Sequence, residues 1–376
     1  MRSFRFILAL SGAATLAACG GSTQPQTVGS TPPGVTPTPT PTNFLDVTAT
    51  TSFDVIGGFQ ALSKQTNANT GAVSTLYTAN ASTVNAPNGT ISYSPRDGVF
   101  TLTVADATAS VNREIRFQDP AHRVQYSAAG FAAQQIPNLP NFNYLEIFDG
   151  TTTPVFFYER PGTRTAYVSL GGYSRTTEDT TAGSFSGERG VFVFGQKTAN
   201  NQIPTSGSGS YAGGFLASMI VDPSGGGSTY LQWINGTSNI GVDFGTGKVS
   251  LAVNGTVGDA YSQGGTVNPN ALFVPAGSTF KAAGTAQVDL TRSGGFTGVF
   301  TQNTATANNV GFTNGGAFTG IDFASVAAGG ATAGASSIDG AFYGPNAVNV
   351  GGNFRIVGGV PNQRVDILGA FTGGKQ

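Results

Sequence analysis

Short runs in which apolar and polar side chains alternate, separated by turn residues, recur along most of this chain of 376 residues. In residues 99–104, for example, the bulky apolar side chains fall on every second position, directly after the turn-forming stretch 94–98. A period of two predicts a β-strand with one buried face, and Gly, Pro, Asn and Asp at the breaks are typical of tight turns. Helical patterns rich in Leu, Glu, Lys and Ala are nearly absent, so the sequence predicts an all-β protein.

The predicted strands fall into two groups on either side of the polar, Gly-containing stretch 202–208, where we place a domain boundary. The first group, in residues 44–203, comprises strands within 90–104, 144–148, 155–158, 167–173 and 190–195. The second group, in residues 204–376, comprises 209–215, 230–234, 240–244, 280–290, 295–300, 338–343, 352–357 and 365–371. Asn235 and Gly236 stand between two of these runs, and this dipeptide predicts a hairpin turn.

Residues 1–19 have the features of a signal peptide: two arginines, a short apolar run and the tetrapeptide Leu16–Cys19. The tetrapeptide resembles a lipobox, in which small residues precede a cysteine that becomes lipidated. Cys19 is the only cysteine of the chain, so we predict lipidation at Cys19. The alternative is an ordinary secretory leader with an Ala-x-Ala cleavage site. Gly20 follows Cys19 where Asp would signal retention at a bacterial inner membrane, which favours the outer membrane.

Residues 20–43 form a predicted linker, because Pro and Thr alternate along much of the segment. Such a composition favours an extended polyproline-like conformation, which would hold a folded body away from the membrane. A Pro-rich peptide ligand for another domain is the alternative.

The most informative stretch is 339–354, which contains turn residues between two extended runs. Phe342 and Tyr343 are large and belong in a packed wall. The turn Gly344–Asn346 follows, since Gly tolerates positive φ and Pro removes a hydrogen-bond donor. Gly351 and Gly352 allow the backbone to bend or to pass close to another strand. This stretch therefore predicts a tight corner between two strands of a closed sheet.

The same stretch resembles a signature of the transferrin-binding-protein-B-like β-barrel family of bacterial surface lipoproteins. The matching residues are Gly340, Phe342, Tyr343, Gly344, Pro345, Ala347, Val350, Gly351, Gly352 and Phe354. Asn349 stands where the family often has an acidic residue. The resemblance implies an eight-stranded antiparallel β-barrel in residues 204–376, preceded by a β-rich handle subdomain in residues 44–203.

Composition excludes several functional classes. Charged residues make up only 10% of the chain and the formal net charge is −1, which leaves no basic patch for a nucleic-acid backbone. One cysteine cannot form an internal disulfide. With 27 phenylalanines the chain can still build a core, so the low charge does not indicate disorder.

The sequence contains no complete catalytic or cofactor-binding motif. Residues 243–249 superficially resemble a phosphate-binding loop, but Val249 stands where that motif needs Ser or Thr. His122 is the only histidine and is predicted to lie in a loop, with a haem or metal role as the weaker alternative. The charged pairs 178–179 and 188–189 are predicted to be solvated turn residues. We therefore predict no enzyme activity, no cofactor and no metal site.

Binding, in contrast, needs only exposed anchors on a rigid scaffold. Trp233 is interpreted first as a core residue; Tyr158, Tyr173 or Trp233 could anchor a partner only if exposed. The loops 160–164 and 258–272 are predicted to take part in ligand capture, because loops on rigid scaffolds usually carry recognition. No contact residue can be taken from the family, whose binding loops diverge.

The family resemblance implies the function. We predict an outer-membrane lipoprotein, anchored by lipid and exposed at the cell surface, that captures a protein or a haem- or iron-bearing ligand. Its partners would be a TonB-dependent outer-membrane receptor and a surface lipoprotein export translocon. A structural or adhesive envelope lipoprotein without a nutrient ligand is the alternative.

Overall fold

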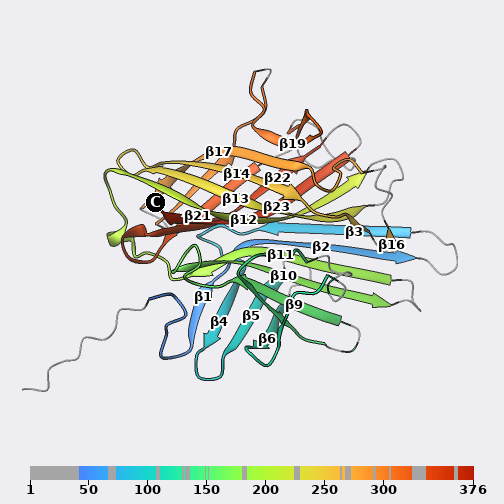
Figure 1. Cartoon of the computed structure of the whole chain (residues 1–376), viewed down its shortest axis with the longest axis horizontal. Coiled ribbons are helices and arrows are strands. Elements are labelled where there is room, and N and C mark those ends of the chain that lie inside the picture. Colours follow the sequence, from blue (N-terminus) through green and yellow to red (C-terminus); the bar gives the residue numbers. More distant parts are fainter. Residues whose placement is uncertain are drawn as a thin grey trace, which may run out of the picture. The chain divides into compact units, whose positions relative to one another are not determined.

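The computed structural model describes most of the chain after residue 41 (Figure 1). The described residues are 42–66, 73–106, 111–128, 131, 136–148, 150, 152–179, 184–223, 229–262, 265–266, 272–290, 294–304, 306–323, 336–359 and 363–376. The predicted signal peptide, Cys19 and nearly all of the predicted linker lie outside them. Residues 41–376 belong to one compact unit. Among the described residues, no helix is long and apolar enough to cross a membrane.

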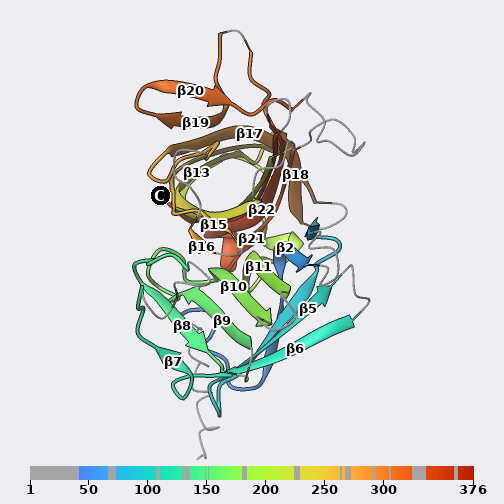
Figure 2. The same cartoon turned by 90° about the vertical axis from the view of Figure 1, so that its right-hand side faces the viewer.

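Eight antiparallel strands in the described part of residues 204–376 close into a ring, which Figure 2 shows end-on. In ring order they are β12 (Ser208–Pro223), β13 (Tyr230–Asp243), β14 (Lys248–Val257), β17 (Thr279–Asp289), β18 (Gly295–Phe300), β21 (Ser336–Tyr343), β22 (Asn349–Gly358) and β23 (Gln363–Lys375). β23 pairs back onto β12, so no edge remains between these strands. The all-β class and the eight-stranded barrel are confirmed by this pairing.

Large side chains fill the barrel. Along β14 the residues alternate between exposed and buried, and Val249, Leu251 and Val253 point into the core. Phenylalanine rings from facing strands meet inside, with centroids 6.2 Å apart for Phe215 and Phe280. An eight-stranded barrel is just wide enough for its side chains to fill, which matches this interior.

Two pairs of short strands extend the barrel sheet at β17 and at β13. β19 (Val310–Asn314) and β20 (Ala317–Gly320) form a hairpin that pairs with the first part of β17 (Figure 2). After this hairpin, Ile321 and Phe323 enter the barrel core. β15 (Tyr261–Ser262) and β16 (Gly265–Thr266) form a small ladder beside β13.

The hairpin predicted at Asn235 and Gly236 is wrong, because both residues lie inside the continuous strand β13. Gly236 pairs with Gly255 on the next strand, and a Cβ at position 236 would lie 2.1 Å from the carbonyl oxygen of Asn254. The Phe215 ring occupies the space over Gly255. The glycine is therefore required by close strand approach in the barrel wall and not by a turn, as is common for glycine inside strands. The turn falls later, at residues 244–247.

The handle region, residues 44–203, contains two sheets. The first comprises β1 (Thr51–Asp54), β4 (Gly89–Ser94), β5 (Val99–Asp106) and β6 (Val111–Gln118). The second runs in the order β3 (Val73–Ala81), β2 (Ile56–Thr66), β11 (Ser184–Gly195), β10 (Val168–Asp179), β9 (Thr152–Glu159), β8 (Phe142–Glu146) and β7 (Arg123–Val124). A 3₁₀ turn, η1 (Asn200–Gln202), leads from the last handle strand to the barrel.

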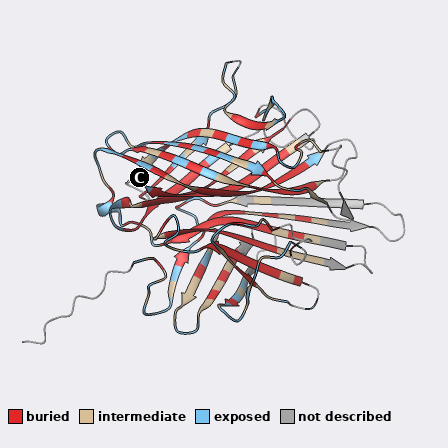
Figure 3. Ribbon diagram, viewed as in Figure 1, coloured by how far each residue is buried: buried red, intermediate tan, exposed pale blue. Residues whose placement is uncertain are grey.

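The second handle sheet is buried on both faces. On β9, Val155 and Phe157 belong to a core shared with the barrel, whereas Phe156 and Tyr158 belong to the core between the two handle sheets. This is why β9 reads as a continuous apolar run and not as an alternating one. The barrel strands that face the handle, β12 and β23, are correspondingly buried along most of their length (Figure 3).

Hydrogen bonds from barrel side chains fasten this seam between handle and barrel. The Asn353 side-chain amide donates to the carbonyl oxygens of Gly57 and Ser82, each at 2.9 Å. Asn349 Oδ1 accepts the backbone N–H groups of Ala166 and Tyr167. An acceptor oxygen is what this position needs, so Asn can stand where the family often has an acidic residue. The predicted domain boundary at 203/204 stays a prediction about independent folding, since the two regions share a core.

The corner at 344–347 forms as the sequence predicts. Gly344 and Asn346 have positive φ, 72° and 54°, in the short 3₁₀ turn η3 (Pro345–Ala347) between β21 and β22. Beyond the turn, the two glycines differ in their surroundings. A Cβ at Gly352 would lie 2.2 Å from the Asp339 carbonyl oxygen, whereas a Cβ at Gly351 would first meet the end of the Val168 side chain at 3.0 Å.

We expect Gly352→Ala to lower the free energy of unfolding by about 1–3 kcal/mol, because backbone atoms of the paired strand would have to move. Gly351→Ala is the matched control and should change it by less than about 1 kcal/mol, since a side-chain terminus can shift. Thermal and denaturant melts of both variants measure the difference. Equal destabilisation by the two substitutions would contradict the packing described for this corner.

Candidate binding site

The aromatic residues considered as exposed anchors are all in the interior. Tyr158, Tyr173 and Trp233 are 3%, 1% and 2% exposed. The two tyrosines lie in the core between the handle sheets, and Trp233 lies in the core shared by handle and barrel. The interpretation of Trp233 as a core residue is confirmed, and none of the three rings can insert into a partner.

The charged pair at 188–189 was predicted to be a solvated turn, and this is wrong. Both residues lie inside β11, where Glu188 forms ion pairs with Arg113 and Arg175. Arg189 is buried, and its guanidinium carbon lies 4.8 Å from the centroid of the Trp233 ring. Burial lowers the pKa of Arg189 to about 9, so the side chain stays positively charged at neutral pH. Glu178 and Asp179 lie at the end of β10.

The predicted loop 160–164 is tied to the body. Arg164 forms an ion pair with Glu159 at 3.2 Å, and the Glu159 side chain is only 1% exposed. Burial raises the pKa of Glu159, and the positive charge of Arg164 opposes that rise. Arg164 also lies close to Gly214 on β12. The loop therefore has a structural role, and its role in ligand capture stays a prediction.

His122 lies in the loop that joins β6 to β7, as predicted. Its Nδ1 atom accepts a hydrogen bond from the backbone N–H of Gln118 at 3.0 Å. No group of three or more His, Cys, Asp or Glu side chains that could hold a metal ion occurs among the described residues. The nearby Arg123 forms an ion pair with Asp119, so its charge serves the loop itself.

A crevice with aromatic walls lies between a handle loop and the barrel (the junction crevice). Its volume is about 330 Å³. Tyr126, Phe131 and Ile136 line it from the handle, and Trp233, Asn235 and Asp259 line it from the barrel. The predicted loop 258–272 thus contributes Gly258 and Asp259 to this crevice, while residues 263–264 and 267–271 lie outside the described part of the chain.

Hydrogen bonds fix both walls of the junction crevice. On the handle side, the Tyr144 hydroxyl donates to the Pro137 carbonyl at 2.7 Å and accepts the Leu139 N–H at 2.8 Å. On the barrel side, the Gly258 N–H donates to the Trp233 carbonyl at 2.7 Å, and Gln232 Nε2 donates to the Gly258 carbonyl. Burial raises the pKa of Tyr144 to about 12, so its hydroxyl keeps the proton that it donates.

The aromatic lining continues into the core. Ring centroids of Tyr126, Phe131 and Tyr144 lie 5.6 Å from one another. Tyr144 stacks on Phe157, whose ring meets Trp233 edge-on at 5.8 Å. Such offset and edge-to-face contacts are favourable, so the crevice wall is the outer side of a packed aromatic cluster.

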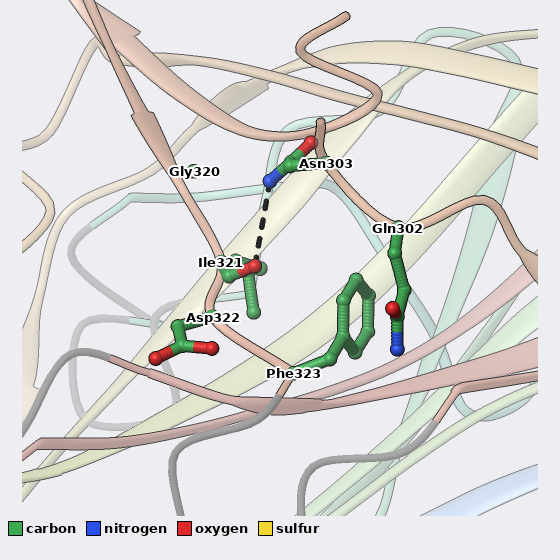
Figure 4. Close-up of a pocket in the computed structure, with 6 residues that line it drawn as sticks. All are labelled: Gln302, Asn303, Gly320, Ile321, Asp322 and Phe323. Carbon is green, nitrogen blue, oxygen red and sulfur yellow. Dashed lines mark hydrogen bonds between the residues drawn. The ribbon is translucent and has the colours of Figure 1, made fainter. Parts of the chain in front are cut away.

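Two further surface depressions lie on the described part of the barrel. One, of about 360 Å³, lies beside β20 and is drawn in Figure 4. Its Asn303 side chain is already used, because it donates to the Val310 carbonyl at 2.7 Å and accepts two backbone N–H groups. The other, of about 730 Å³, is a groove on the barrel wall that is lined by β12, β13, β14, β17 and β18 and includes Val299.

Sequence reasoning missed Tyr126, Phe131 and Ile136 as lining residues. These three residues lie between β7 and β8 and outside any strand, and no strand period or turn motif in the sequence draws attention to them. Their partner wall is about one hundred residues away in the sequence, beyond the reach of any local pattern. Only the aromatic character of Tyr126 and Phe131 in a polar, alanine-rich segment could have served as a signal.

Comparisons with known proteins give similar structures and no similar sequence. No family model and no curated protein matches the chain. The chain is similar to intact transferrin-binding protein B with N and C lobes (Ap-TbpB): 13% identity, 87% of this chain, 78% of that chain, TM-score 0.35. It is also similar to a transferrin-binding protein B vaccine antigen from Haemophilus parasuis Hp5, with 16% identity over 87% of this chain and 76% of that chain and a TM-score of 0.35. A third similar structure is isotype 1 transferrin-binding protein B from serogroup B Neisseria meningitidis, with 13% identity over 85% of this chain and 64% of that chain and a TM-score of 0.29.

A buried carboxyl on the seam gives a prediction about pH. Asp339 is 5% exposed and accepts the Val84 backbone N–H of the handle. Burial raises its pKa from 3.8 to about 6, although the hydrogen bond from Val84 and the charge of Lys197 oppose the rise. Because the folded-state pKa is the higher one, the folded protein is stabilised by protonation. That contribution is full below pH 4 and is lost as pH rises through about 6.

In the parent protein we expect the free energy of unfolding to fall by up to about 3 kcal/mol between pH 4 and pH 7, because Asp339 loses its proton over this range. In Asp339→Asn this fall should be absent. Asn can still accept the Val84 N–H. Denaturant melts across this pH range measure it. Asp243→Asn is the matched control, because hydrogen bonds from Thr246 lower the pKa of that exposed carboxyl and give an effect of opposite sign. The same pH slope in parent and Asp339→Asn would contradict the assignment.

Proposed function

We propose that this protein is a binding protein that captures a partner at the junction crevice and the neighbouring loops. The junction crevice carries the proposal, because it combines aromatic walls, a polar rim and hydrogen-bonded sides in one concave place. Ligand sites in proteins usually have this form. The barrel interior is packed with its own side chains, so a large ligand has to bind outside it.

Binding is favoured over catalysis. The chain has one histidine and one cysteine, which leaves imidazole and thiolate chemistry with a single candidate each. His122 lies in an exposed loop whose charged neighbours pair with each other. The junction crevice offers one carboxylate, Asp259, and one phenol, Tyr126, and its described lining contains no histidine, cysteine, lysine or arginine. A site of this kind can orient a ligand through its aromatic walls and its polar rim.

The cellular setting belongs to the same proposal. The lipobox-like Leu16–Cys19 and the Pro- and Thr-rich segment 20–43 support a lipid-anchored protein held away from a bacterial outer membrane. The motif in 339–354 supports capture of a protein or a haem- or iron-bearing ligand for a TonB-dependent receptor, after export by a surface lipoprotein translocon. A structural or adhesive envelope role is the second candidate. Pull-down of iron- and haem-bearing proteins with the body from residue 44 separates the two.

One exposed side chain outside the crevice tests whether the capture surface extends beyond it. Phe148, near the tip between β8 and β9, is 77% exposed. Exposed aromatic residues on rigid hairpins are suited to anchor a partner. We expect Phe148→Ser to weaken capture in the pull-down and to leave the melt within about 0.5 kcal/mol of the parent. Val299→Ser on the barrel wall, where Val299 is 55% exposed, is the matched control and should leave capture unchanged. Equal capture by all three proteins would remove Phe148 from the binding surface.

The anchor is tested separately. Cys19→Ala should abolish incorporation of labelled palmitate and release the protein from membranes, because stable anchoring requires several acyl chains. Ser22→Ala, three residues later, is the control and should keep both properties. Membrane association and labelling that persist in Cys19→Ala would rule out lipidation at this residue.

A further inference from the structure

We propose that the junction crevice is the receptor for one aromatic side chain that carries a hydrogen-bond donor, a tyrosine of the partner protein. The inference rests on the proposed function, since it names the group that the binding protein recognises. It concerns the walls formed by Tyr126, Phe131 and Trp233, and the rim residues Asn235 and Asp259.

Size favours a single ring. The volume of about 330 Å³ is at the lower end of the range for small-molecule sites. A pocket of this size can accept one aromatic side chain, and such a side chain buries a large apolar area with few rotatable bonds. Interface residues of this type, inserted into a fixed pocket, usually dominate binding energy.

The walls offer the contacts that a ring prefers. Tyr126 is half-buried and Phe131 is buried, and both present aromatic surface to the same space. An incoming ring can therefore make offset or edge-to-face contacts with them, and these contribute beyond area burial. Because the cluster behind them is already packed down to Phe157, little rearrangement is needed when the crevice is filled.

The rim favours a donor on that ring. Asp259 is exposed, and an ionised carboxylate can only accept hydrogen bonds. Asn235 adds a side-chain amide, whose oxygen accepts hydrogen bonds and whose NH₂ group donates them. A phenol hydroxyl can donate to the carboxylate and accept from the amide, whereas an unsubstituted ring uses neither group.

Charge argues for a neutral ring. Arg189, positively charged at neutral pH, already lies 4.8 Å from the Trp233 ring centroid. A cationic ligand beside the same ring would be repelled by that buried charge, where the effective dielectric constant is low. An anionic ligand would meet the Asp259 carboxylate at the rim. A neutral phenol avoids both repulsions.

Trp233 reports on the crevice directly, because it is the only tryptophan of the chain. We would titrate the full chain with p-cresol, the tyrosine side-chain analogue, and follow tryptophan fluorescence. The comparison probes are 4-methylanisole, which lacks the donor, cyclohexanol, which lacks the ring, and n-butylammonium, which is a cation. We expect saturable binding of p-cresol with a Kd on the order of 1 mM, and weaker binding of each other probe.

Two variants locate the site. Ala128 is exposed and lines the crevice, so Ala128→Phe should fill it and weaken p-cresol at least about tenfold. Ala121→Phe is the matched control, because Ala121 is exposed and does not line the crevice. Asp259→Ala should remove the preference for p-cresol over 4-methylanisole and keep the affinity for the ring.

Three results would overturn the inference: no saturable response to p-cresol, unchanged p-cresol affinity in Ala128→Phe, or tighter binding of n-butylammonium than of p-cresol. The capture assay keeps this separate from the proposed function. Partner capture that survives in Ala128→Phe, while p-cresol binding is lost, would refute a partner tyrosine in the crevice and leave capture by the neighbouring loops as the proposed function. A parent chain that binds p-cresol and captures no protein would refute the proposed function while supporting a phenol-binding crevice.

Discussion

Strands β2, β9, β10 and β11 lie between two other layers, so nearly every side chain along their middle has to fit one core or the other. Successive residues of a strand point to opposite faces, and a slip of one residue would exchange the two sets. Val155 and Phe157 would then leave the barrel side for the sandwich side. The register of this sheet, and with it the position of the barrel on the handle, is therefore specified by packing on both faces at once.

This burial creates a second requirement along the seam, where polar groups lose water. Backbone carbonyls of the handle receive donors from barrel side chains, as Gly57 does from Asn353, and the handle N–H groups of Ala166 and Tyr167 find Asn349. Each buried polar group left without a partner would lower the stability of the folded protein by about 1–3 kcal/mol, so these hydrogen bonds are needed where the seam excludes water. They also fix one region against the other more closely than apolar contacts alone would, because hydrogen bonds depend on direction.

Much of the fold could be predicted from the sequence because its signals are local. The period of two in 99–104, the corner at 344–346 and the all-β class each depend on a few consecutive residues. The errors came where tertiary contacts override a local signal. Asn235 and Gly236 are a typical turn dipeptide, but here Gly236 allows two barrel strands to approach closely. Arg189 is a charged residue, but here it is buried at the seam beside the Trp233 ring. The loop that supplies Asp259 could be predicted, but the junction crevice could not, since its two walls meet only after the whole body has folded.

The crevice also divides its residues into two kinds. Trp233 and Phe131 are core residues with one side toward the crevice, so replacing either would open a cavity in the aromatic cluster as well as change the wall. Asn235, Asp259 and Ala128 lie at the rim, are at least partly exposed, and can change with little effect on the fold. Apolar affinity is thus tied to stability, whereas ligand preference depends on residues outside the packed core. A scaffold arranged in this way can acquire a new specificity through its rim while the seam and the barrel stay as they are.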